Sequence, residues 1–118
     1  MIGRQVKGFR RAIVHDDEIA TGGTVLKLCD LLIDQGIEEI SLVCSHGLFL
    51  GDALPRIAEI PQIREIVTTD TVPREDSEIP DNMVILSTAP VFGDAIRQNY
   101  YRRSIGELFD FGQGRDYE

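Results

Sequence analysis

Two carboxylates and a short loop of small residues stand close together near the start of this 118-residue chain. Asp16 and Asp17 follow an apolar run at residues 12–14, and Thr-Gly-Gly-Thr follows them at 21–24. A turn of small residues before a helix presents backbone N–H groups at the positive end of the helix dipole, which favours phosphate. Carboxylates beside it accept hydrogen bonds from sugar hydroxyls or hold a hydrated Mg²⁺. Together these residues predict a site for a sugar phosphate.

Each part of this pattern also has an ordinary explanation. A Gly-Gly pair serves plain strand-to-helix turns, and paired aspartates occur in solvated turns. The loop is not a Walker loop, because no Gly-Lys-Ser/Thr follows it, and the G-x-G-x-x-G pattern is absent. A receiver-like domain would use strand-end aspartates with Mg²⁺ and a lysine at the same edge, but the only lysines, Lys7 and Lys27, do not fit. The combination of the loop and the carboxylates therefore favours a sugar-phosphate site.

Strands that alternate with helices must position these residues. Apolar runs predict strands at residues 9–15, 39–44, 64–68 and 83–87. Apolar spacing and helix-ending residues predict helices at 23–35, 52–60 and 91–103, with a short helical turn at 105–109. The segment 72–82 contains two prolines and four acidic residues, so it is expected to be an exposed loop.

This alternation predicts an α/β fold. We expect one three-layer Rossmann-like domain over residues 1–118, with a mostly parallel sheet, helices on both faces and a frayed tail at 111–118. Ligands bind beyond the carboxyl ends of such strands. That edge would carry the two aspartates, Ser45-His46, residues 68–70 and Ser87-Thr88. His46 is expected to be a hydrogen-bonded structural residue rather than a substrate contact.

The composition excludes several classes of protein. The net charge of −8 argues against a nonspecific nucleic-acid surface. No apolar run approaches the ~20 residues that span a membrane, and the first residues lack the apolar segment of a signal peptide. Cys29 and Cys44 have no metal-ligand spacing and are expected to be buried thiols of a cytoplasmic protein.

The segment Asp-Asp-Glu-Ile-Ala-Thr-Gly-Gly-Thr at 16–24 resembles the signature of the type I phosphoribosyltransferase fold, and the whole chain more closely resembles the ribose-phosphate pyrophosphokinases. Further segments carry the resemblance in order along the chain: Ser-His-Gly-Leu-Phe at 45–49 with Ala-Leu at 53–54, Ile-Val-Thr-Thr-Asp-Thr-Val-Pro at 66–73, Leu-Ser-Thr-Ala-Pro at 86–90, Ala-Ile-Arg at 95–97 and Ser-Ile-Gly-Glu-Leu-Phe at 104–109.

The resemblance implies roles for particular residues. The 5-phosphate of ribose 5-phosphate or phosphoribosyl pyrophosphate would be wrapped by a loop, here called the 20–24 loop, that consists of Ala20, Thr21, Gly22, Gly23 and Thr24. Asp16 and Asp17 would accept hydrogen bonds from the ribose 2′- and 3′-hydroxyls, with Mg²⁺ nearby, held by them directly or through ligand or water. The implied reaction is transfer of pyrophosphate from ATP to ribose 5-phosphate.

Two features depart from the family pattern. Ala20 stands where the family usually carries Asp, and His15 replaces an apolar residue. The resemblance also covers only what would be the C-terminal half of the enzyme, so we expect the chain to be inactive alone and either to form a homo-oligomer or to require an N-terminal half. Alternatives are a phosphoribosyltransferase acting on a base and a non-catalytic regulatory subunit.

Overall fold

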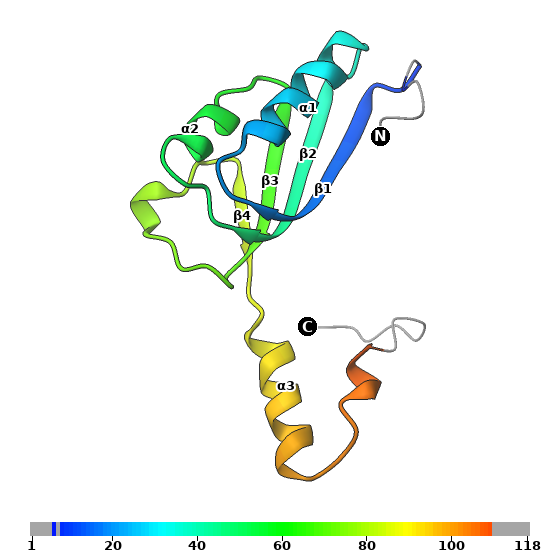
Figure 1. Ribbon diagram of the computed structural model, residues 1–118, viewed down its shortest axis with the longest axis vertical. Coiled ribbons are helices and arrows are strands. Elements are labelled where there is room, and N and C mark those ends of the chain that lie inside the picture. Colours follow the sequence, from blue (N-terminus) through cyan, green and yellow to red (C-terminus); the bar gives the residue numbers. More distant parts are fainter. Residues whose placement is uncertain (1–5, 7, 110–118) are drawn as a thin grey trace. The chain divides into compact units, whose positions relative to one another are not determined.

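The computed structural model describes Val6 and residues 8–109, and the chain divides into two compact units, Met1–Leu86 and Ser87–Glu118. In the first unit, strands alternate with helical segments (Figure 1). Its elements are β1 (Arg11–Ile19), α1 (Gly23–Asp34), β2 (Glu39–Gly47), α2 (Ala53–Ala58), β3 (Ile63–Thr69), the 3₁₀ turn η1 (Asp76–Glu78) and β4 (Met83–Leu86). The predicted α/β class is confirmed. The expectation of a single domain stays a prediction.

The four strands form one parallel sheet in the order β1-β2-β3-β4. Ala12 pairs with Ile40 and Asp16 with Cys44, so β1 and β2 run side by side over most of their lengths. The register between β2 and β3 shifts after Ile40, where Arg64 is the extra residue. Because all strands are parallel, their carboxyl ends lie at one edge of the sheet.

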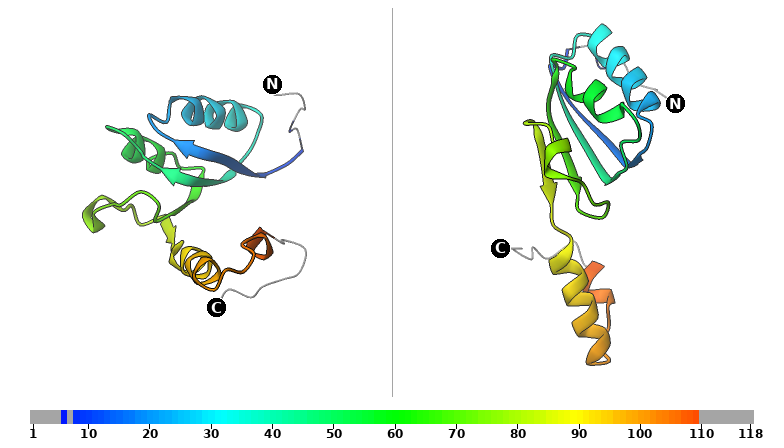
Figure 2. Two further views of the ribbon diagram at one scale, coloured as in Figure 1. Left: turned by 60° about the horizontal axis from the view of Figure 1, so that its bottom comes forward. Right: turned by 90° about the vertical axis from the view of Figure 1, so that its left-hand side faces the viewer.

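The core lies between the sheet and two helices. Val25, Cys29 and Leu32 follow one face of α1, and α2 buries Ala53, Leu54 and Ile57. Alternate residues of β2 from Ile40 to Cys44 are buried beneath them, namely Ile40, Leu42 and Cys44. Figure 2 shows α1 and α2 on the same face of the sheet.

The first unit by itself contains part of the predicted layers. Helices were expected on both faces of the sheet, whereas the described part of the first unit carries them on one face only. The opposite face exposes apolar side chains of strand residues, including Ile13, Val84 and Leu86. A second helical layer over this face stays a prediction.

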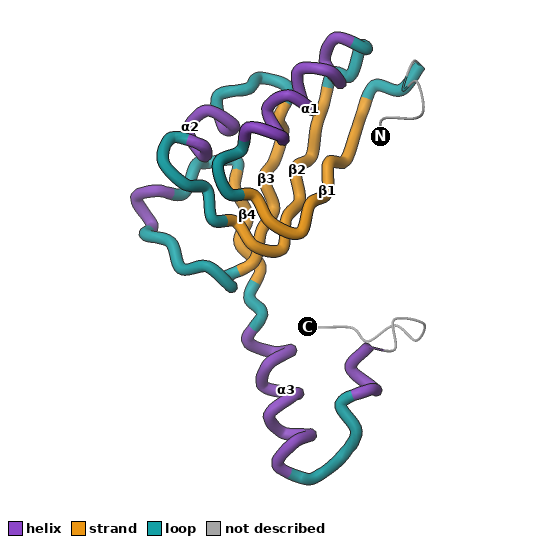
Figure 3. Tube along the Cα trace, viewed as in Figure 1, coloured by secondary structure: helices purple, strands orange, loops and turns teal. Residues whose placement is uncertain are grey.

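Strand β1 is longer than the sequence predicted. It was expected to end at His15, but it continues to Ile19 because Glu18 and Ile19 still pair with His46 and Gly47 of β2. The two aspartates therefore belong to the strand rather than to the turn after it. Figure 3 shows β1 as a strand beside β2.

The second unit contains α3 (Ala89–Tyr100) and the 3₁₀ turn η2 (Gly106–Phe109). The helix was predicted at 91–103, but Pro90 lies in its first turn, where a missing N–H costs nothing, and the helix starts earlier. Ser87 and Thr88, expected at the ligand edge, belong to this unit. The predicted frayed tail, 111–118, lies outside the described residues.

Among Val6 and residues 8–109, the structure contains no helix with the length and apolar character needed to cross a membrane.

Candidate functional site

The turn between β1 and α1 forms the candidate site. Gly22 stands immediately before α1 and takes the left-handed conformation, with φ of 76°. No side chain in the described part of the chain caps this end of the helix, and its first turn carries no acidic residue. The first N–H groups of an uncapped helix are available to an anion, and the helix dipole favours negative charge there.

A cavity of about 220 Å³ opens at this turn. Its volume is several times the ~30 Å³ share of a water molecule in liquid water, so it has room for a phosphate group. The structure brings the whole 20–24 loop to this cavity together with one of the two predicted aspartates. The lining residues are Asp16, Glu18, Ile19, Ala20, Thr21, Gly22, Gly23, Thr24 and Val25.

Glu18 is a lining residue that the sequence interpretation did not assign to the site. It follows Asp16 by two positions, and residues two apart on a strand share a face. The sequence did not indicate this shared face because β1 was expected to end before both residues. Asp17, which was assigned to the site, is exposed and does not line the cavity.

The two aspartates nevertheless interact. The backbone N–H of Asp17 donates a hydrogen bond to Asp16 Oδ1 over 2.9 Å. Hydrogen bonding with the Asp16 side chain, followed by hydrogen bonding with the amides of Glu18 and Asp17, lowers the pKa of the Asp17 carboxyl below its usual value. Asp17 is therefore a carboxylate at neutral pH and adds negative charge beside the cavity.

Hydroxyl groups gather at the carboxyl ends of β2 and β3. His46 Nδ1 lies 2.8 Å from Thr71 Oγ1, and Thr69 Oγ1 donates a hydrogen bond to the Ser45 carbonyl over 2.6 Å. The positive field of His46 also contributes to the lowered pKa of Asp17. His46 is thus hydrogen-bonded within the protein, the arrangement that the sequence favoured.

The residues present fit Mg²⁺ held jointly with a ligand. The described residues contain no group of three or more His, Cys, Asp or Glu side chains that could hold a metal ion by themselves. Mg²⁺ usually keeps several waters and binds one or two carboxylates together with phosphate oxygens of a ligand. The neighbouring carboxylates of Asp16 and Asp17 match this mode of binding.

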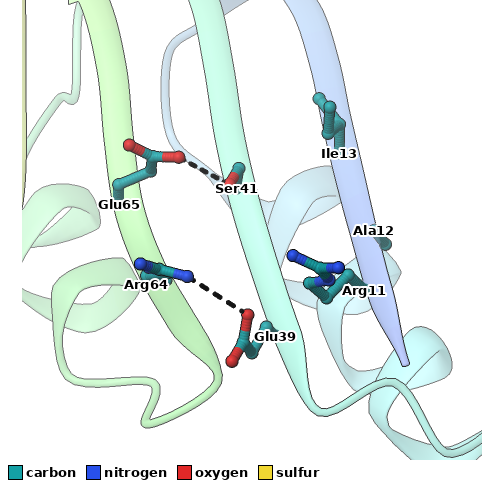
Figure 4. Close-up of a pocket in the computed structure, with 7 residues that line it drawn as sticks. All are labelled: Arg11, Ala12, Ile13, Glu39, Ser41, Arg64 and Glu65. Atoms are coloured by element: carbon teal, nitrogen blue, oxygen red, sulfur yellow. Dashed lines mark hydrogen bonds and ion pairs between the residues drawn. The ribbon is translucent and has the colours of Figure 1, made fainter.

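Two of the larger hollows, both lined in part by β1, lie away from this turn. One, of about 380 Å³, is on the face of the sheet opposite the helices and is lined by residues of β1, β2 and β3 (Figure 4). Most of its polar groups engage each other, since Arg64 pairs with Glu39 at 3.5 Å and Ser41 donates to Glu65 over 2.7 Å. The other, of about 440 Å³, follows β1 and is lined mainly by apolar residues. Neither combines an uncapped helix end with carboxylates.

Comparison with known proteins gives consistent matches. The family model of the phosphoribosyl synthetase-associated domain matches residues 2–110. A protein of Streptomyces coelicolor described as a ribose-phosphate pyrophosphokinase is 46% identical over 101 residues, which are 86% of this chain and 32% of that protein. The ribose-phosphate pyrophosphokinase of Rhodopirellula baltica is 38% identical over 109 residues, covering 92% of this chain and 34% of its own.

A solved structure gives the same result. The crystal structure of phosphoribosylpyrophosphate synthetase from Mycobacterium smegmatis superimposes with a TM-score of 0.78 at 31% identity, over 85% of this chain and 33% of that one. The chain therefore spans about a third of the length of the relatives that it matches. The chain was expected to match half of the enzyme, and this was wrong. The comparison also does not support the expected match to the C-terminal part of the relatives.

Proposed function

Because the chain belongs to the family of the phosphoribosyl synthetase-associated domain, we propose that it binds ribose 5-phosphate or phosphoribosyl pyrophosphate through the 20–24 loop, as part of a ribose-phosphate pyrophosphokinase. The observation that carries this proposal is the cavity at the uncapped start of α1, which joins backbone N–H donors to the Asp16 carboxylate. The donors suit the phosphate, and the carboxylate suits the ribose hydroxyls.

The loop holds the phosphate mainly through its backbone. N–H groups at the start of α1 donate to the phosphate oxygens, and the hydroxyls of Thr21 and Thr24 add two side-chain donors. Asp16 accepts hydrogen bonds from the ribose hydroxyls, and Glu18 faces the same cavity. This arrangement fixes the orientation of the sugar, the main contribution that binding makes to transfer of pyrophosphate to a sugar hydroxyl.

Asp16 and Asp17 would hold Mg²⁺ through water or through ligand oxygens, and the ion would neutralise charge on the phosphate or pyrophosphate groups. The lowered pKa of Asp17 keeps one of these carboxylates ionised well below neutral pH.

The complete enzyme would convert ATP and ribose 5-phosphate to phosphoribosyl pyrophosphate and AMP. The 118-residue chain spans about a third of its relatives, so we expect it to bind the pentose phosphate without transferring pyrophosphate. Ala20 favours a second candidate, a regulatory subunit that keeps the fold and the ligand but performs no transfer, because a methyl group lines the cavity where the family usually has a carboxylate.

Calorimetry with ribose 5-phosphate and phosphoribosyl pyrophosphate, each with and without Mg²⁺, tests the proposal. We expect millimolar or tighter binding that Mg²⁺ strengthens and that the double variant Asp16→Asn, Asp17→Asn loses. The double variant Asp30→Asn, Asp34→Asn makes the same change of charge on exposed positions of α1 and should bind like the wild type. Absence of binding at millimolar ligand, or equal binding by both double variants, would contradict the site.

A further inference from the structure

The base of the 20–24 loop is held by the chain segment that follows β2. Backbone N–H groups of Leu48 and Phe49 both donate to the Ile19 carbonyl over 3.0 Å, and that of Leu50 donates to the Ala20 carbonyl over 2.8 Å. These bonds fix the last residue of β1 and the first residue of the loop. We call this segment, residues 47–50, the supporting turn. The direction in which the loop leaves β1 therefore depends on the conformation of the supporting turn.

The supporting turn adopts an unfavourable conformation. Phe49 has a φ of 46°, in the left-handed region that residues with a side chain rarely occupy. Phe49 is 4% exposed, and its ring lies so close to Gly47 that a Cβ there would overlap it. Such backbone persists only where surrounding contacts impose it.

Arg74 supplies these contacts. Its side chain is 10% exposed, and its Nη2 donates to the carbonyls of Gly47 and Leu48 over 2.8 and 3.1 Å. Its guanidinium carbon lies 5.2 Å from the centre of the Phe49 ring. A single planar group thus holds two successive carbonyls of the turn and the aromatic ring beside them.

The ion pair of Arg74 with Glu78 is the weaker of its interactions. Glu78 Oε2 lies 3.8 Å from Nη1, and the Glu78 side chain is 58% exposed. A pair at this distance whose carboxylate is solvated contributes little to stability. The bonds to the supporting turn are therefore the main interactions of this arginine.

We propose that Arg74 is a positioning residue for the 20–24 loop: it imposes the left-handed supporting turn, whose N–H groups fix Ile19 and Ala20 and thereby set where the loop presents its phosphate donors. This inference rests on the proposed function. Arg74 lies in the connection after β3 and does not line the loop cavity, so it acts through the turn rather than on the ligand.

The test compares the full chain with three variants. Arg74→Met keeps the length of the side chain and removes every donor, whereas Arg74→Lys keeps the charge but loses the planar fork. Arg64→Met is the control, because Arg64 is also an arginine with a carboxylate partner but lies on β3 in an exposed pair with Glu39. All measurements are made below the unfolding transition of each variant.

The first readout is hydrogen exchange of the Phe49 and Leu50 amides, compared with the Leu42 amide in the core. We expect Arg74→Met to reduce protection of the first two about tenfold relative to Leu42, the size expected for loss of a hydrogen bond to a charged group. Arg74→Lys should lose less, and Arg64→Met should change neither amide. Equal loss at all three amides of Arg74→Met would overturn the proposal, because it would indicate general destabilisation only.

The second readout is the dissociation constant of ribose 5-phosphate with Mg²⁺ at saturating concentration. We expect a rise of about tenfold in Arg74→Met, a smaller rise in Arg74→Lys and no change in Arg64→Met. If the wild type binds and Arg74→Met binds equally well, the positioning role is wrong although the proposed function stands. If the wild type does not bind, the proposed function fails, and the exchange of the Phe49 and Leu50 amides alone decides whether Arg74 holds the turn.

Discussion

The backbone N–H of Leu50 donates a hydrogen bond to the carbonyl of Ala20 over 2.8 Å. Leu50 follows β2 and Ala20 follows β1, so the connection after one strand holds the connection after the other. Contacts from α2 support the same loop, because Ala53 and Ile57 pack beneath Gly22. The geometry of the candidate site therefore depends on the segment between β2 and α2 as well as on the loop itself.

Replacement of Gly22 tests this packing. A Cβ at Gly22 would lie 3.2 Å from Ile57 Cδ1 and 3.4 Å from the Ala53 Cβ, and the residue has a φ of 76°. A side chain in the left-handed region costs about 1–2 kcal/mol, so we expect Gly22→Ala to lower the free energy of unfolding by about that amount. Urea denaturation measures it.

Gly23→Ala is the matched control for this prediction. Gly23 is the first residue of α1, and a Cβ there would meet no atom within 4 Å. Alanine favours a helix by about 0.5–1 kcal/mol over glycine, so stability should stay equal or rise slightly. Equal losses of unfolding free energy in the two variants would contradict the prediction, because the left-handed conformation and the close packing occur at Gly22 only.

The sequence was sufficient to predict the main elements of the first unit because their apolar patterns are regular. Val25, Cys29 and Leu32 mark the buried face of α1, and strand β2 alternates buried and partly exposed residues. The end of β1 was missed because residues 16–18 have the composition of a polar turn, whereas Asp16, Glu18 and Ile19 still pair with β2. Such pairing depends on the partner strand and cannot be predicted from the pattern of apolar and polar residues within β1.

The pH dependence of stability tests the environment of Asp17. Its folded pKa lies below the unfolded value, so the carboxylate stabilises the fold above the unfolded pKa of about 3.9, and this contribution disappears as pH falls through the folded pKa. Asp17→Asn should therefore be less stable than the wild type at pH 6, and the difference should shrink toward pH 3. Urea midpoints at several pH values measure it, and a difference that does not change with pH would refute the assignment.

The two cysteines are expected to be unreactive in the folded chain. Cys29 and Cys44 are free and buried, and burial is the main cause that raises the pKa of each thiol. Thiolate is the reactive form, so a thiol reagent at pH 8 should label neither residue quickly in the native protein and both in denaturant. Rapid labelling of either thiol without denaturant would show that its part of the core opens readily.

The site was only partly predictable. The sequence indicated the 20–24 loop and Asp16 as candidates because small residues and an acid stand close together, and the structure places these residues around one cavity. Arg74 was missed because it lies in an acidic, proline-containing stretch that reads as an exposed loop. Arg74 is buried by contacts with Gly47, Leu48 and Phe49. Contacts between segments so far apart in the sequence cannot be predicted from the residues next to Arg74.

The most direct test of the account is an NMR titration of the ¹⁵N-labelled chain with ribose 5-phosphate and Mg²⁺. We expect the largest amide shifts at residues 21–25, where the uncapped N–H groups of α1 would meet the phosphate, and we expect ribose without phosphate to leave these amides nearly unchanged. Large shifts confined to other parts of the sheet, or none at millimolar ligand, would contradict it.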